Sequence, residues 1–136
     1  MSAKGAPIED YIAVADFRTA LRRFLRTSER IAHQSGLTPQ RYLLLLMIKG
    51  AKSGTERSTV TELADRLQLA QSTVTELVSR AEETGLIARE PSPDDARVAH
   101  LRLTPEGERR LLASFSGLTT ERRQLRDSVA HLAESG

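Results

Sequence analysis

Residues 58–104 hold the pattern that most constrains how this chain can fold. Apolar residues recur there at three- and four-residue steps in two short runs, which predicts two amphipathic helices joined by a tight turn. The runs are Leu63, Ala64 and Leu67, and Val74, Leu77 and Val78. The small Ala64 stands where the helices must cross closely, and Gly85 suits the left-handed residue that ends the second helix.

Two strand-like runs follow, at about residues 86–90 and 97–103. Apolar and polar side chains alternate in the second run, as they do in a half-exposed strand. The cluster Pro91-Ser92-Pro93-Asp94-Asp95 between the runs is a turn signal. Two helices and a turn followed by a hairpin are the layout of a winged helix-turn-helix, so the predicted fold is mainly α with a small β-wing.

Proline and capping signals predict where the other helices begin. Thr38-Pro39 and Thr104-Pro105 each place an N-cap before a proline at the first helical position. The Thr-x-x-Glu spacing of a capping box occurs twice and predicts the starts of the third and fourth helices. These pairs are Thr59 with Glu62 and Thr73 with Glu76.

The terminal segments predict helices with apolar stripes. A first helix is expected from about residue 9 to 33, ended by Gly36, and a last one over about 120–133. Residues 114–117, which include Ser114 and Gly117, should interrupt the fifth helix. The two stripes consist of Tyr11, Val14, Phe17, Leu21, Phe24 and Ile31, and of Leu125, Val129 and Leu132. Because they exceed what one small winged unit can cover, a homodimer is predicted.

Length and composition limit the class of protein. A chain of 136 residues fits one domain, without room for a second catalytic module. It contains no cysteine, so disulfides and thiol chemistry are excluded. No apolar run approaches the ~18 residues of a membrane span, and no signal peptide is evident, which favours the cytoplasm. The chain carries a net charge of +2, but residues 58–104 hold five arginines against eight acids, which weighs against strong non-specific DNA binding.

The sequence gives little support to an enzyme. His33, His100 and His131 lie far apart without acidic partners at metal-site spacing. Neither a glycine-rich phosphate loop nor a serine nucleophile elbow occurs. We therefore expect no catalytic site, no metal and no cofactor.

Over nearly its entire length the chain resembles the MarR family of bacterial transcription regulators. The resemblance rests on four motifs that occur in the family's order. These are Leu37-Thr38-Pro39-Gln40, the Leu-Ala-x-x-Leu run from Leu63 to Leu67, Ser72-Thr73-Val74-Thr75, and the wing pattern Asp95, Arg97, Leu101, Leu103 and Thr104. The resemblance implies dimerisation helices at 9–35 and 105–136 and a DNA-binding region at 37–104. It further implies a homodimeric, ligand-responsive repressor on a palindromic operator.

The recognition helix implied by the resemblance covers about residues 71–84. Its candidate DNA-binding residues are Gln71, Ser72, Thr73, Thr75, Glu76 and Arg80, with Asp95 and Arg97 on the wing. Short polar side chains at a helix N-terminus can meet base edges or phosphates, and Arg97 can enter a minor groove with Asp95 orienting it. Ser72 or Thr73 capping the helix, and Asp95 making a turn, are the competing structural roles.

Two features depart from the family pattern. Glu76 stands where many members have a basic residue, and it can either pair with Arg80 at i+4 or accept a hydrogen bond from cytosine. The interrupted fifth helix is short and can alter the dimer. The resemblance also implies a small aromatic or anionic effector in a cleft between the first, second and fifth helices, although no residue identifies one. A protein-interaction module that uses the acidic 58–104 surface is the alternative function.

Overall fold

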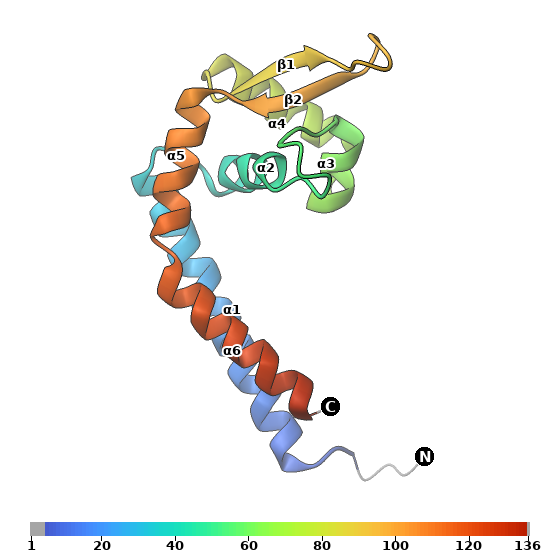
Figure 1. Ribbon diagram of the computed structural model, residues 1–136. Helices are drawn as coiled ribbons and strands as arrows, with labels where there is room; N and C mark the ends of the chain where they lie inside the picture. Colours follow the sequence, from blue (N-terminus) through green and yellow to red (C-terminus); the bar gives the residue numbers. More distant parts are fainter. Residues whose placement is uncertain (1–4, 136) are drawn as a thin grey trace.

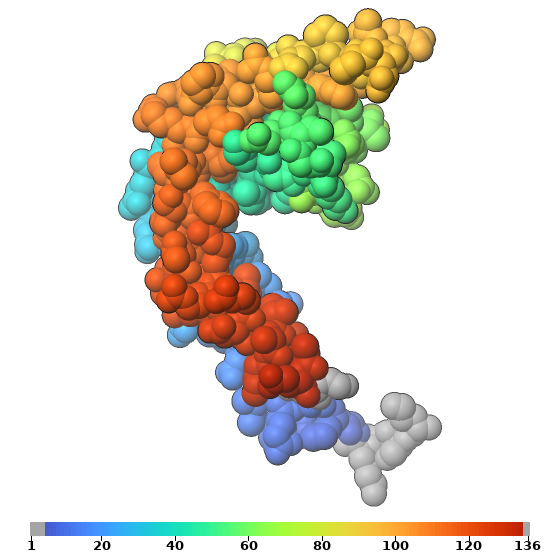
Figure 2. All heavy atoms as spheres, in the orientation of Figure 1, coloured from blue at the N-terminus to red at the C-terminus, as the bar shows by residue number. Residues whose placement is uncertain are grey.

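The computed structural model describes residues 5–135 and divides into a winged head and a long two-helix arm (Figure 1). The head contains α2 (Pro39–Lys49), α3 (Val60–Leu67), α4 (Gln71–Glu83), β1 (Ile87–Pro91) and β2 (Ala99–Leu103). The arm contains α1 (Ile8–Gln34) and α6 (Thr119–Ser135), and α5 (Pro105–Ser116) joins the two parts. In space-filling view the head overhangs one side of the arm, which gives the molecule a hooked outline (Figure 2). The predicted mainly helical fold with a small β-wing is confirmed.

The core of the head is built around α2. Leu44, Leu45 and Ile48 of this helix are fully buried, because α3, α4, α5 and the hairpin all pack against it. Burial of each such side chain contributes roughly 1.5–3 kcal/mol, so one helix supplies much of the hydrophobic stabilisation of the head. The partners that are likewise fully buried are Leu63, Val74, Val78, Leu86 and Leu101.

Three of the four predicted helix starts have the expected caps, at Thr38, Thr59 and Thr104. The Thr38 hydroxyl accepts the Arg41 N–H at 3.2 Å, and Pro39 follows at the first helical position. Thr59 and Glu62 form the complete capping box, with N–H to side-chain oxygen distances of 3.2 and 2.8 Å. These bonds satisfy N–H groups that have no partner within the helix.

The capping box predicted at Thr73 and Glu76 is wrong. Helix α4 begins at Gln71, and its N-cap is Ala70, whose extended backbone places no side chain on the first-turn N–H groups. Thr73 and Glu76 therefore lie inside the helix, at its third and sixth positions. The same spacing occurs within helices as at their starts, and the actual start, three residues earlier, is set by the turn after α3.

That turn depends on a left-handed residue that is not glycine. Gln68 has φ 56° and ψ 46°, and the Leu69 N–H donates to the Ala64 carbonyl at 3.1 Å. The bond satisfies a terminal carbonyl of α3 and turns the chain directly into α4. Ala64 is 8% exposed at the place where the helices pack, as its small size predicted.

The wing is an antiparallel hairpin in which Ile87 pairs with Leu103 and Arg89 with Leu101. A third backbone segment joins it. Ser58, just before α3, exchanges two backbone hydrogen bonds with Leu101, at 3.1 and 2.8 Å. One residue that pairs with a strand leaves no repeating pattern of apolar and polar residues in the sequence. This link between the wing and the head was therefore not predicted.

The arm forms because α1 and α6 pack side by side (Figure 1). On α1 the small residues Ala13 and Ala20 are buried, which allows the α6 backbone to approach closely. The predicted apolar stripe is correspondingly rotated: Tyr11 and Val14 were expected to pack, but they are 60% and 47% exposed. The arm therefore presents an uncovered apolar strip beside its packed face.

The predicted interruption after α5 is confirmed, since α5 ends at Ser116 and α6 begins at Thr119. Gly117 lies against Ile31 of α1, where a Cβ atom would come within 2.9 Å of the Ile31 Cδ1 atom. The Arg122 guanidinium stacks over the Phe115 ring at 3.9 Å and bridges the two helices across the break.

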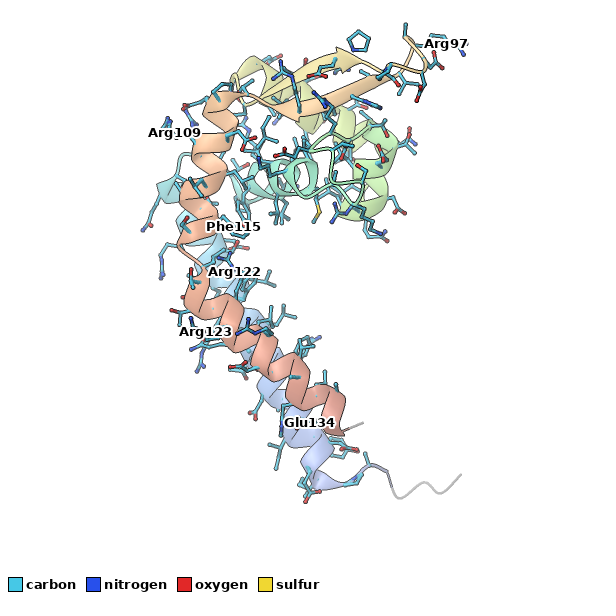
Figure 3. All side chains as sticks on the ribbon, viewed as in Figure 1. Arg97, Arg109, Phe115, Arg122, Arg123 and Glu134 are labelled. Atoms are coloured by element: carbon cyan, nitrogen blue, oxygen red, sulfur yellow. The ribbon has the colours of Figure 1, made fainter. Side chains whose placement is uncertain are left out.

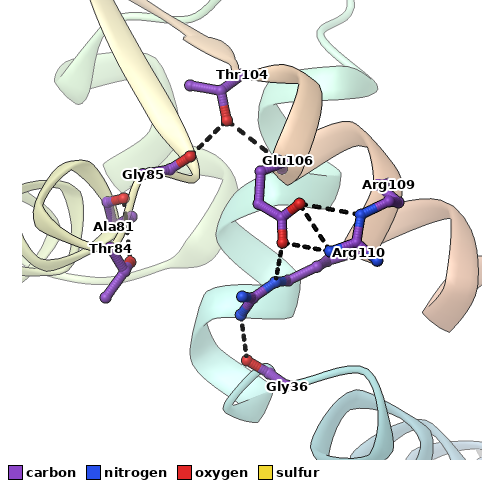
Figure 4. A network of polar contacts seen from close by, with 9 residues as sticks. Gly36, Ala81, Thr84, Gly85, Thr104, Glu106, Arg109 and Arg110 are labelled. Carbon is purple, nitrogen blue, oxygen red and sulfur yellow. Dashed lines mark hydrogen bonds and ion pairs between the residues drawn. The ribbon is translucent and has the colours of Figure 1, made fainter.

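Thr104 ties together the ends of four elements (Figure 4). Its hydroxyl donates to the Gly85 carbonyl at 2.6 Å and accepts the Gly107 N–H at 3.1 Å. Its N–H donates to the Leu86 carbonyl at 3.0 Å. Thr104 thus caps α5 while holding the residues that follow α4. The two chain segments approach so closely that a Cβ on Gly107 would lie 2.1 Å from the Leu86 oxygen.

This geometry predicts unequal costs for two glycine substitutions. Gly85→Ala should lower the free energy of unfolding by about 1–2 kcal/mol, because Gly85 has φ 76° but open space around it. Gly107→Ala should cost at least about 3 kcal/mol, since the added methyl group meets backbone that cannot move without separating α5 from the wing. Urea unfolding of both variants measures the difference. A smaller loss at Gly107 than at Gly85 would contradict the packing described.

Candidate nucleic-acid interface

One face of α4 is buried and the opposite face is open. Val74, Val78 and Ala81 are fully buried against the head, at three- and four-residue steps. The exposed side of the helix carries all six candidate residues predicted on it. These are Gln71, Ser72, Thr73, Thr75, Glu76 and Arg80. The structure therefore places them on one accessible surface.

The N-terminal turn of α4 keeps free hydrogen-bonding groups. Because Ala70 is the N-cap and makes no side-chain bond, the prediction that Ser72 or Thr73 caps the helix is wrong. Within residues 5–135 neither hydroxyl has a side-chain partner. Gln71 is tethered weakly, with its Nε2 atom 3.4 Å from the Thr61 hydroxyl oxygen. Exposed N–H groups and hydroxyls at a helix start suit phosphates and base edges.

Glu76 and Arg80 form the ion pair predicted from their spacing, with 2.7 Å between Arg80 Nη2 and Glu76 Oε1. Both side chains are more than half exposed. Exposed pairs of this kind contribute at most about 1 kcal/mol, so a competing phosphate or base can displace either partner.

The wing tip presents Arg97 (Figure 3), whose side chain is 91% exposed. Asp95 accepts the Arg97 backbone N–H at 3.0 Å and Nε at 3.1 Å, so one carboxylate both shapes the turn and orients the guanidinium. The adjacent guanidinium holds the pKa of Asp95 below its usual range. Both roles considered for Asp95, turn former and orienting group, are present.

The other arginines of the wing are engaged in ion pairs. Arg89 Nε lies 2.8 Å from Glu82 Oε1, which attaches β1 to α4. The Glu90 carboxylate accepts a hydrogen bond from Arg57 at 2.9 Å and also forms an ion pair with Arg102. Both contacts lower the pKa of Glu90, and the hydrogen bond from Arg57 has the largest effect. The arginines on the open face around α4 and the wing are consequently already paired with carboxylates. The sequence gives the number of these charged residues, but their ion pairs join separate elements and could not be predicted from it.

An apolar groove of about 760 Å³ lies between α2 and α5. Its apolar lining comes from Leu46, Pro105, Leu111, Leu112 and Phe115. The groove was expected between the first, second and fifth helices, yet the residues that line it come from α2, the residue after it, and α5.

The charged side chains at the edge of the groove neutralise one another. Lys49 Nζ lies 3.0 Å from Glu108 Oε2 and also pairs with Glu56. The Glu56 hydrogen bond is the main cause of the raised Lys49 pKa. Arg109 pairs with Glu106. Each cation at the groove is therefore already balanced by a carboxylate.

The part of the chain that the structure describes contains no group of three or more potential metal ligands. Within the same residues, none of the helices combines the length and the apolar character that crossing a membrane requires.

A sequence profile of the MarR family matches residues 35–98, from the end of α1 to the wing. Together with the winged head and the relatives below, this match decides the assignment. The chain belongs to the MarR family.

The matching relatives are regulators by name. The chain is 32% identical over 100 residues to an uncharacterised HTH-type transcriptional regulator, YsmB, of Bacillus subtilis, covering 71% of this chain and 66% of that protein. It is 37% identical over 75 residues to the HTH-type transcriptional repressor MdtR of the same organism, covering 55% and 46%. The match thus spans between about half and two thirds of the curated relatives' length.

Among solved structures, a mutant MarR from E. coli complexed with operator DNA has the same fold. Its TM-score is 0.68 at 20% identity, with 86% of this chain and 85% of that chain covered.

The two wing arginines should differ in their effect on DNA binding. Arg97→Ala should weaken binding to duplex DNA by roughly tenfold or more, because this guanidinium stands 91% exposed at the wing tip, where Asp95 orients it for a minor groove. Arg89→Ala should have a much smaller effect, since Arg89 lies within β1, away from the wing tip, and its less exposed side chain attaches the strand to α4 through Glu82. Fluorescence anisotropy with a labelled duplex measures both. Equal losses would show that the wing tip is not a DNA arm.

Proposed function

We propose that this chain is a sequence-specific DNA-binding transcription regulator, acting as a homodimeric, ligand-responsive repressor of a palindromic operator in the bacterial cytoplasm. Two features together carry the proposal. The N-terminus of α4 is polar and has no side-chain cap, and the tip of the wing presents Arg97. Family membership supports it, as do the repressor name of one relative and the operator complex of a structural neighbour.

The two elements fit different grooves. Helix α4 would enter the major groove, where Gln71, Ser72 and Thr73 at its start meet base edges and phosphates. The wing would extend along the duplex and place Arg97 in the neighbouring minor groove, whose negative potential attracts a guanidinium. Asp95 reduces the entropy lost on binding because it already restricts the arginine.

A second copy of the chain would cover the exposed apolar strip of the arm. The strip includes Ile8, Tyr11, Ile12 and Val14 of α1, each at least 47% exposed. An exposed patch of this kind on a helix favours association, and a two-fold dimer presents two recognition helices to a palindrome. Sedimentation of the full chain at micromolar concentration should give a dimer, and a monomer would contradict this part of the proposal.

Selection of bound duplexes from a random pool tests the function directly. The proposal predicts a palindrome whose half-sites are one helical turn apart, about 10 base pairs between centres. Recovery of unrelated duplexes, with no common sequence at moderate salt, would instead favour the protein-interaction module. That alternative uses the acidic 58–104 surface and needs no specific DNA.

A substitution at Glu76 shows how the exposed face of α4 and the wing, here called the reading face, meets DNA. If Glu76 mainly repels phosphates and occupies Arg80, Glu76→Gln should strengthen binding to all duplexes, and the salt dependence should steepen by up to ~0.9 for one added contact. If Glu76 accepts a hydrogen bond from cytosine, the variant should lose about 1–3 kcal/mol on the selected operator alone. We expect the first result. Selective loss on the operator with an unchanged salt slope would refute it.

The α2–α5 groove is the proposed effector site, and its chemistry favours an uncharged aromatic molecule over an anion. The floor is apolar, and Lys49 and Arg109 are already paired with carboxylates. An anion would lose hydration and would also have to displace a carboxylate from Lys49 or Arg109 to gain a cation.

Two fluorescent probes of similar shape distinguish these classes. Neutral 2-naphthol should bind roughly tenfold more tightly than 2-naphthoate, given the cost of desolvating a charge. Leu112→Gln should weaken naphthol binding, whereas Val98→Gln on the wing serves as an exposed control away from the groove. Tighter binding of naphthoate, or no effect of Leu112→Gln, would contradict the assignment. If Leu112→Gln instead dissociated the dimer, the groove would be an interface between copies.

A further inference from the structure

We propose that Arg110 is a positioning residue that fixes the head relative to the arm, and thereby the half-site spacing that the dimer accepts. The inference rests on the proposed function, because spacing has a meaning only for a dimer on a palindrome. Arg110 lies on α5, away from the exposed face of α4 and from the wing tip, so it would act through the structure rather than by touching DNA.

Arg110 joins segments that are far apart in the chain. Its Nη1 atom donates to the Gly36 carbonyl at 3.0 Å, across 74 residues, and its Nε atom donates to Glu106 Oε1 at 2.9 Å (Figure 4). Gly36 is the left-handed residue just after α1, so its carbonyl marks the end of the arm helix. The Arg110 side chain is about one third exposed, and its charge makes these bonds stronger than bonds between neutral groups.

The second end of this connection reaches the recognition helix. Glu106 lies in the first turn of α5, two residues after Thr104. Thr104 caps that turn and donates to the Gly85 carbonyl directly after α4. Arg110 and Glu106 thus join the end of α1 to the first turn of α5 by hydrogen bonds, and Thr104 joins the same turn to the end of α4. Within the turn, the helix backbone connects the two sets of bonds.

Glu106 remains charged near neutral pH. Its pKa is lowered by the hydrogen bonds from Arg109 and then from Arg110. The carboxylate therefore keeps holding Arg110 in the direction of Gly36 under ordinary conditions.

The connection matters because the chain passes between arm and head at only a few places. Within residues 5–135 these are the turn at 35–38 and the α5 helix with its break. Rotation of the head about α5 would separate Arg110 from the Gly36 carbonyl. Adding one base pair between half-sites moves each recognition helix by about 3.4 Å and about 34° relative to the other. A head that is held at one angle should reject such a change.

Arg109 provides a matched control on the same helix. It also donates to Glu106, at 2.9 Å from its Nε atom, but Gly36 accepts from Arg110. Its side chain is 71% exposed. Removal of either arginine takes one positive charge from α5 and one hydrogen-bond donor from Glu106. Removal of Arg109, however, keeps the bond from Arg110 to the Gly36 carbonyl at the end of α1.

The experiment measures affinity for the selected palindrome and for versions with one base pair added or removed between half-sites. For the wild-type chain we expect the native spacing to be preferred by roughly tenfold or more. Arg110→Ala should reduce this preference by roughly tenfold, the size expected for one charge-assisted hydrogen bond. A lysine cannot donate to Glu106 and to Gly36 at the same time as the forked guanidinium does. The spacing preference of Arg110→Lys should therefore lie between those of the wild type and Arg110→Ala. Arg109→Ala, measured without added effector because Arg109 also lines the α2–α5 groove, should keep the wild-type preference.

A purely structural role would give a different result. If Arg110→Ala and Arg110→Lys lowered affinity for all spacings equally, or if Arg109→Ala had the same effect as Arg110→Ala, the positioning role would be wrong. A wild-type chain without any spacing preference would contradict the proposed dimeric reading of a palindrome. A wild-type preference that Arg110→Ala leaves unchanged would contradict this inference alone.

Discussion

The hydrogen bonds of Thr104 are the constraint on which the working parts of the molecule depend. The Thr104 side chain bonds both to the residue after α4 and to the first turn of α5, and the Thr104 backbone N–H donates to Leu86 at the base of the wing. The recognition helix, the wing and the helix that leads to the arm therefore move together. The close approach of Gly107 to Leu86 leaves no space for an independent hinge at this point. A change at α5 has a direct physical route to α4, which the proposed response to a ligand requires.

The electrostatics of the reading face favour specificity over general affinity. Arg80, Arg89 and Arg97 each have a carboxylate partner within the same surface. Non-specific binding depends on unpaired cations that release counterions from phosphates, so this face should bind random DNA weakly. Exposed ion pairs are inexpensive to rearrange, and a duplex with the right groups can engage these arginines. Under the proposed function, shape and hydrogen bonding then decide which duplex is bound.

Local signals in the sequence predicted much of this structure. The caps at Thr38 and Thr59 and the pair of Asp95 with Arg97 depend on residues within a few positions of each other. The false capping box at Thr73 shows the limit of such signals, because its spacing does not reveal whether a helix has already begun.

Features that join distant segments could not be predicted. The Ser58 bridge to the wing and the Arg110 bond to the end of α1 depend on the folded path of the chain, as does the rotated packing face of α1.

Hydroxyl-radical footprinting of the selected palindrome tests the central claim most directly. With the recognition helices in consecutive major grooves and the wings outside them, protection should be two-fold symmetric, with centres about 10 base pairs apart. Minor-groove protection should flank the centres, and Arg97→Ala should remove the flanking protection while the central pattern persists. A footprint without symmetry, or flanks unaffected by Arg97→Ala, would contradict the account of how this chain binds DNA.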